Sequence, residues 1–135
     1  MNITVSQTER VVPVTILHIQ GSIDGLSYMD LVKKVEELYE NGTRDLLLDL
    51  SEVPFLSSAG VVALHKVSRI MRGQNAREDD GWASIHAIDR DVENGIQKHV
   101  KLLNPQPKVE SVLEVSGFNR FFEVFANLEK ALGAF

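Results

Sequence analysis

Short apolar runs alternate along the chain with stretches in which apolar residues recur at helical spacing. The runs predict strands, the first together with a turn, over residues 3–12, 14–19, 44–49 and 99–103. The helical spacing predicts helices over residues 27–40, 58–72 and 107–116. Strands that alternate with helices are typical of an α/β fold with a mostly parallel sheet of four to five strands and helices packed on it.

Residues at the ends of these elements support the same interpretation. Ser27 is placed to cap the first helix, with Asp30 three residues later as a weak capping box. Gly117 stands where the 107–116 helix should end, and Asn127 is placed to cap a final helix. Residues 121–124 fit either a short last strand or an apolar corner. In the 58–72 helix, the basic residues between the apolar positions should face solvent: Lys66, Arg69 and Arg72.

The run from Leu46 to Leu48 is apolar without alternation, as expected of a strand covered on both faces. Residues 73–98 interrupt the alternation of strands and helices with a polar, mostly acidic stretch that contains Trp82. A connection this long is typical of an insertion in a compact domain. We therefore expect one domain over residues 1–135 with a polar insertion at about 73–98.

Composition narrows the classes of function. The chain has 135 residues, 44% hydrophobic and 24% charged, which fits one soluble globular domain. Its formal net charge of -5 disfavours nucleic acid as a partner, because phosphate contacts need clustered Lys and Arg. With 0 cysteines there is no disulfide or thiolate metal site. Neither a signal peptide nor a membrane span is evident, so we expect a cytoplasmic protein without membrane insertion.

The most informative stretch runs from Asp49 to Gly60. A predicted strand ends at Asp49, a short loop follows, and Ser57 and Ser58 come directly before a predicted helix. The positive end of a helix dipole favours an anion, so a hydroxyl there is well placed to carry or bind a phosphate. On the residues alone, the alternative is that Ser58 is a plain cap for the helix amides.

These residues resemble a STAS domain, the fold of the bacterial anti-sigma factor antagonists. The resemblance rests on the turn Gly21-Ser22-Ile23-Asp24, on the stretch 49–60, and on Asn104-Pro105 followed by apolar residues and Gly117. It implies the STAS fold, a mostly parallel sheet with one antiparallel edge strand. It also implies a binding protein rather than an enzyme, with no cofactor and no metal.

In the best-known branch of that family the loop reads Asp-Ser-Ser-Gly, and the first serine is phosphorylated by an anti-sigma factor that is also a serine kinase. Aligned on Phe55 and Gly60, that serine falls on Ser58, the Asp on Ser57 and the second serine on Ala59. The resemblance thus implies that the unmodified form binds the anti-sigma factor and that phosphorylation of Ser58, with Ser57 as second choice, releases it. A PP2C-type phosphatase fits the same scheme as the enzyme that resets it. The implied partner-binding residues are Asp24, Ser57, Ser58, Ala59 and Gly60.

Three other functions stay open at this stage. Another branch of the family supplies non-switching accessory subunits of lipid or anion transporters. The strand that ends in an acid at Asp49 also resembles the phosphoacceptor strand of a receiver domain. A receiver, however, needs a pair of acidic residues to hold a divalent cation, and the corresponding turn here offers Asp24 alone. A serine hydrolase is disfavoured because there is no Gly-x-Ser-x-Gly elbow and the four histidines are scattered along the sequence.

Overall fold

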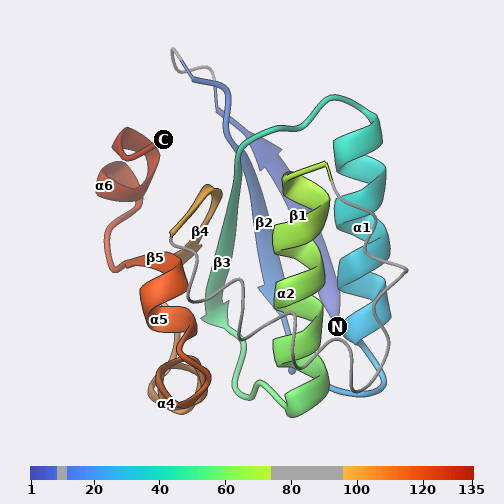
Figure 1. The fold of residues 1–135 in the computed structure, drawn as a ribbon, viewed down its shortest axis with the longest axis vertical. Coiled ribbons are helices and arrows are strands. Elements are labelled where there is room, and N and C mark those ends of the chain that lie inside the picture. The colour runs from blue at the N-terminus through green and yellow to red at the C-terminus, as the bar shows by residue number, and fades with distance from the viewer. Residues whose placement is uncertain (9–11, 74–95) are drawn as a thin grey trace.

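The computed structural model describes residues 1–8, 12–73 and 96–135, and within them a five-stranded sheet with the order β1-β2-β3-β4-β5 (Figure 1). Strand β1 is antiparallel to β2, and the other neighbours are parallel. The strands are β1 (Asn2–Gln7), β2 (Thr15–Gln20), β3 (Leu46–Glu52), β4 (Gln97–Leu103) and β5 (Phe122–Phe125). The helices are α1 (Tyr28–Glu40), α2 (Ser58–Met71), α4 (Pro107–Ser116), α5 (Phe118–Phe121) and α6 (Leu128–Gly133). The expected α/β fold with one antiparallel edge strand is confirmed.

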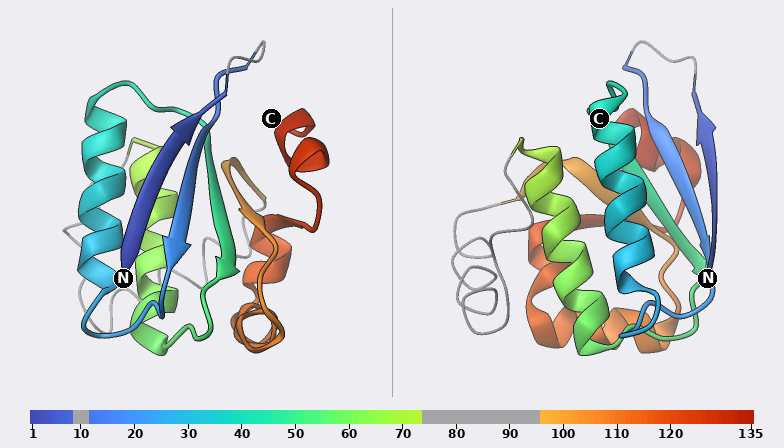
Figure 2. Two further views of the ribbon diagram at one scale, coloured as in Figure 1. Left: turned by 180° about the vertical axis from the view of Figure 1, so that it is seen from behind. Right: turned by 90° about the vertical axis from the view of Figure 1, so that its right-hand side faces the viewer.

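The two faces of the sheet are covered unequally. Helices α1 and α2 lie on one face, where Leu46 and Leu48 of β3 join the main core. On the other face Leu47 packs in a smaller cluster with Ala131 and Leu132 of α6. All three leucines are fully buried, which explains why this strand shows no alternation. Seen from behind, β1, β2 and much of β3 have no described helix over them (Figure 2). We call the part of this face on β1–β3 that lies outside the smaller cluster the open face.

Helix α2 is the central helix, between α1 and the C-terminal part of the chain. Burial therefore extends from its apolar side to its flanks. Lys66, predicted to face solvent, is buried, whereas Arg72 is exposed as expected. The prediction for Lys66 was wrong because helical spacing identifies the most apolar side of a helix but not how much of its circumference neighbouring elements cover.

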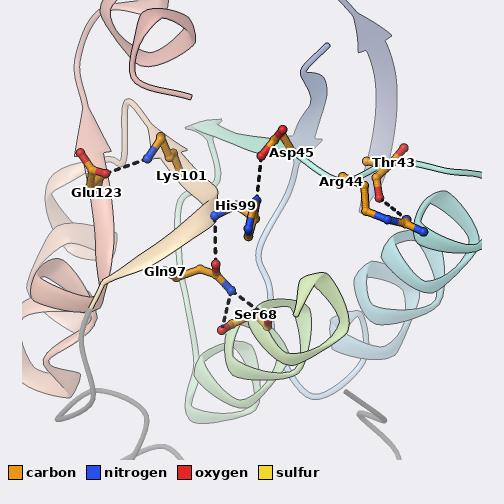
Figure 3. Close-up of polar contacts among 8 residues, drawn as sticks. All are labelled: Thr43, Arg44, Asp45, Ser68, Gln97, His99, Lys101 and Glu123. Carbon is orange, nitrogen blue, oxygen red and sulfur yellow. Dashed lines mark hydrogen bonds and ion pairs between the residues drawn. The ribbon is translucent and has the colours of Figure 1, made fainter. Parts of the chain in front are cut away.

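Among the element boundaries that differ from those predicted, two bear on named residues. Strand β3 continues to Glu52, so Asp49 lies inside it rather than at its end. Strand β4 begins at Gln97, whose buried side-chain amide donates to the carbonyl and hydroxyl oxygens of Ser68 in α2 at 2.9 and 3.2 Å (Figure 3). The last two residues of the predicted insertion therefore belong to the sheet. Residues 74–95, including Trp82, lie outside the described residues.

The caps agree with the sequence at two helices and differ at one. Asn127 accepts the Lys130 N–H at 3.1 Å, and Gly117 ends α4 with φ 80°, a left-handed conformation that suits glycine. Ser27 precedes α1 but its side chain caps nothing, so the proposed capping box is wrong. Its hydroxyl donates instead to the Ser22 carbonyl at 2.8 Å, within the turn before the helix.

An ion pair between a buried lysine and a partly exposed glutamate joins the C-terminal strands. Lys101 of β4 is buried, with its side chain 2% exposed, and its Nζ donates to Oε1 of Glu123 in β5 at 2.7 Å (Figure 3). The same Nζ lies 5.0 Å from the centre of the Phe135 ring, within reach of a cation–π contact. An ammonium group in such surroundings needs its carboxylate partner, because loss of one member of a buried pair leaves an uncompensated charge.

We expect Glu123→Ala to lower the free energy of unfolding by about 1–3 kcal/mol, because it leaves the buried Lys101 ammonium without its anion. The double variant Lys101→Met/Glu123→Ala should recover most of that loss, since it removes the buried charge as well. Urea unfolding followed by circular dichroism measures both. Glu114→Ala on the exposed side of α4 is the control and should change stability by less than about 0.5 kcal/mol. Equal stability of Glu123→Ala and wild type would contradict this account.

Candidate functional site

The loops that join β2 to α1 and β3 to α2 run side by side at the carboxyl edge of the parallel strands, at the bottom of Figure 1. The Ile23 N–H donates to the Phe55 carbonyl at 3.1 Å, and the Ile23 carbonyl accepts the Ser57 N–H at 3.0 Å. Ile23 and Leu56 form a parallel bridge, and both are buried. The two loops therefore form one unit, anchored by a pair of apolar side chains in the core.

The two serines of this unit have different surroundings. Ser57 is the N-cap of α2: its hydroxyl oxygen accepts the Gly60 N–H at 3.2 Å and its hydroxyl donates to the Ile23 carbonyl at 3.4 Å. Ser58 is the first residue of α2 and is exposed. The hydroxyl of Ser57 is thus part of the local structure, whereas that of Ser58 stands at the surface beside the free amide groups of the helix end.

Gly60 allows α2 to start this close to the neighbouring loop. A Cβ at this position would lie 2.4 Å from the Ile23 carbonyl oxygen and 2.5 Å from Cδ1 of Leu56. Any side chain would push the helix away from Ile23, so the glycine is needed for close approach rather than for an unusual backbone angle. Ala59 is half-buried beside it.

Asp24 organises the other loop. Its Oδ1 accepts the N–H groups of Leu26 and Ser27 at 3.0 and 3.2 Å, and the Ser27 hydroxyl oxygen lies 3.2 Å from the same oxygen. This is the turn-fixing role that Asp side chains often play. Asp24 also remains partly exposed, at the same edge as Ser58.

Three exposed apolar side chains accompany the serines, and we call them the apolar rim: Leu26, Met29 and Phe55, with exposures of 96%, 36% and 49%. They come from the two joined loops and from the start of α1. Sequence reasoning missed them. The available signal was an apolar residue in a turn, after Gly25 in one loop and after Pro54 in the other.

Asp49 lies outside the two joined loops, on the open face. Its Oδ2 is 2.9 Å from Nδ1 of His18, the residue directly opposite in β2, and its Oδ1 accepts the Ser51 N–H at 3.0 Å. Nε2 of His18 is in turn 3.3 Å from the Ser6 hydroxyl in β1. A second such pair joins Nδ1 of His99 to Asp45 at 3.0 Å (Figure 3). The histidines are scattered in sequence, but the sheet gives two of them carboxylate partners.

The contacts from Ser6 through His18 to Asp49 follow the order of a hydrolase triad. These side chains, however, lie on neighbouring strands of the open face, and Ser6 is exposed. Cross-strand pairs of this kind stabilise a sheet by about 0.2–1 kcal/mol. For a receiver domain, Asp49 would have to present a free carboxylate after its strand, and here it is engaged within it. Among residues 1–8, 12–73 and 96–135, no group of three or more His, Asp or Glu is arranged to hold a metal ion.

The five residues expected to contact a partner all lie at one edge of the molecule: Asp24, Ser57, Ser58, Ala59 and Gly60.

Within the described part of the chain, no helix is long and apolar enough to cross a bilayer.

Comparison with known families matches residues 2–77 to the STAS domain. The chain belongs to the STAS domain family. The matched segment contains both joined loops and all of α2, so it covers every residue of the candidate site. None of the curated proteins compared with the chain matches it.

Solved structures share the STAS fold over nearly the whole chain. A proposed anti-sigma factor antagonist from Thermotoga maritima is 16% identical, with 97% of this chain and 92% of that one covered and a TM-score of 0.71. An anti-sigma factor antagonist from Mycobacterium paratuberculosis is 19% identical, with coverage of 98% and 93% and a TM-score of 0.65. The Bacillus cell fate determinant SpoIIAA in its phosphorylated form is 16% identical, with coverage of 98% and 97% and a TM-score of 0.58. At these identities the likeness is one of fold.

The close packing of this STAS domain at Gly60 leads to a stability prediction. Gly60→Ala should lower the free energy of unfolding by about 1–3 kcal/mol, because the new methyl group overlaps a backbone oxygen that cannot move without loosening both loops. Thermal or urea unfolding measures the change. Gly133→Ala is the matched control, since a Cβ there meets nothing within 4 Å. Equal effects of the two substitutions would contradict the view that the close approach of α2 to Ile23 requires glycine at position 60.

Proposed function

We propose that this STAS domain is an anti-sigma factor antagonist whose unmodified form binds an anti-sigma factor with serine kinase activity. Phosphorylation of Ser58 by that partner then releases it. The observation that carries the proposal is the exposed hydroxyl of Ser58 at the first turn of α2, next to the apolar rim. A relative by fold, SpoIIAA, has been solved in a phosphorylated form, so the scaffold is compatible with such a modification.

Ser58 is a better acceptor than Ser57 on physical grounds. Phosphorylation of Ser57 would disturb its capping bond to Gly60 and its contact with Ile23. Loss of an N-cap serine costs about 1 kcal/mol. Phosphorylation of Ser58 breaks no side-chain hydrogen bond within the described part of the chain, and its side chain is already exposed.

The fold should tolerate a phosphate on Ser58. The modification adds roughly -1.5 to -2 charges, and the N-terminus of a helix favours each such charge by about 0.3–1 kcal/mol. The first turn of α2 contains no acidic residue that would repel it. The effect of the phosphate is therefore expected at the surface rather than in the core.

At that surface the apolar rim explains how a phosphate would release a partner. Leu26 and Phe55 offer apolar area that a partner would cover. A phosphate beside them would be desolvated in the contact without a cation to pair with, and Asp24 at the same edge adds like charge. A penalty of about 1.4 kcal/mol already weakens binding tenfold.

In this scheme the domain acts by binding, without catalysis, cofactor, metal or nucleic acid, and it works in the cytoplasm. A phosphatase of the PP2C type would restore the binding form. The transporter-subunit alternative uses the same edge for docking but makes no use of the Ser58 hydroxyl, so the modification separates the two. No observation favours the receiver alternative.

Incubation with ATP and serine kinases of the anti-sigma factor type from the same genome should place one phosphate on Ser58, located by mass mapping. Ser58→Ala should abolish the modification. Ser57→Ala should keep it while losing about 1 kcal/mol of stability, because only the cap is removed. Modification of Ser57 in the wild type, or unchanged labelling of Ser58→Ala, would overturn the assignment to Ser58.

Ser58→Glu should weaken binding to the same kinase by tenfold or more in titration calorimetry, since it places a negative charge in the contact. Ser58→Ala should bind as well as wild type. Ser111→Glu, an exposed position in α4, is the charge-matched control and should leave affinity unchanged. Leu26→Ser should also weaken binding, because it removes the most exposed side chain of the apolar rim. Wild-type affinity of Ser58→Glu would contradict the proposed switch.

A further inference from the structure

Strand β1 forms one edge of the described sheet. It pairs with β2 on one side only, and no described strand lies on its other side. Alternate residues of an edge strand direct their backbone N–H and C=O groups outward, where they can pair with another strand. Strand β1 spans six residues, Asn2–Gln7, and every second one of them is available for such pairing.

The sequence of β1 lacks the features that usually protect an edge. The strand reads NITVSQ, with no charge, no proline and no glycine, in a chain of which 24% of residues are charged. Natural edges are commonly blocked by charged side chains, prolines, bulges or short length. The opposite edge, β5, is only four residues long and carries Glu123. The two edges therefore differ in how readily they would accept a further strand.

The helix side of β1 is incompletely covered. Ile3 and Val5 pack against the main core but remain partly exposed, in contrast to the buried Leu17 and Ile19 of the neighbouring strand. Another strand beyond β1 would bring further side chains against these two residues on the same face. An apolar residue at the partner's matching positions would suit them best.

We propose that the β1 edge binds the β1 edge of a second copy of this chain, antiparallel and about a two-fold axis perpendicular to the sheet. This arrangement joins two five-stranded sheets into one of ten strands. The two-fold axis keeps odd-numbered residues on the same face in both copies, so with Thr4 at the middle of the seam Ile3 of one copy meets Val5 of the other. Because β1 is uncharged, two chains of net charge -5 can meet there without like charges at the seam.

A second copy is favoured over an unrelated strand because both strands of the contact are then the uncharged β1, and neither brings a charged side chain to the seam. The seam is one strand wide, so it gives a weak dimer that depends on concentration. The antiparallel arrangement directs the carboxyl edges of the two sheets, with their Ser58 residues, away from each other. Dimer formation is therefore independent of the proposed phosphorylation.

Sedimentation equilibrium or light scattering over a concentration series should show a monomer–dimer equilibrium. Thr4→Lys should raise the dimer dissociation constant at least tenfold, because Thr4 is exposed on the open face and lies at the middle of the seam. Its counterpart would sit directly or diagonally opposite, within reach of charge repulsion. Ser51→Lys adds the same charge to the exposed end of β3 and should leave the dimer unchanged.

Crosslinking gives a second readout, because the chain has 0 cysteines. Thr4→Cys should form dimers with a short thiol crosslinker, whereas Ser51→Cys should not. Urea unfolding of each variant confirms that it is folded, and kinase labelling of Ser58 should be equal in all of them. A monomer at every concentration, or a dimer that Thr4→Lys leaves intact, would overturn the proposal while leaving the phosphorylation scheme untouched.

Discussion

The carbonyl group of Ile23 is the contact on which the candidate site depends. It accepts the Ser57 N–H, lies against the Ser57 hydroxyl, and occupies the space that a side chain on Gly60 would need. One buried residue thereby fixes the position of two loops and the start of α2. Since the loops come from different strands, this contact converts sequence-distant residues into one rigid edge. Whatever binds there meets a surface that is already formed, and preorganisation of this kind reduces the ordering cost of binding.

Neighbouring serines can have separate roles because a helix start divides its residues between inside and outside. The cap residue turns its hydroxyl back toward the amide groups, while the next residue points away from the helix axis. Ser57 and Ser58 show this division, with one hydroxyl bonded and the other at the surface. A covalent anion on the outer hydroxyl changes the charge of the surface without removing any bond that holds the loops. In the proposed scheme, signalling and stability are thus assigned to adjacent residues.

Much of this could be predicted from the sequence, because strands, helices and most caps depend on local patterns. Asn127 and Gly117 were identified correctly from residue type alone. What could not be predicted depends on which segments become neighbours. The burial of Lys66, the pairing of His18 with Asp49 and the exposure of Leu26 follow from the order of the strands and the width of the helix layer. A pattern along one segment contains no information about the segment beside it.

The sheet also separates the surfaces of the molecule from one another. Parallel strands bring the loops before α1 and α2 to one edge, whereas the antiparallel β1 runs alongside with its unpaired side facing a different direction. The pair of His18 with Asp49 links β2 to β3 beside these regions. The hydrogen bonds that join the two loops involve no residue of β1. A change of charge at Ser58 and an association through β1 would therefore act independently, so one assembly could contain phosphorylated and unphosphorylated copies together.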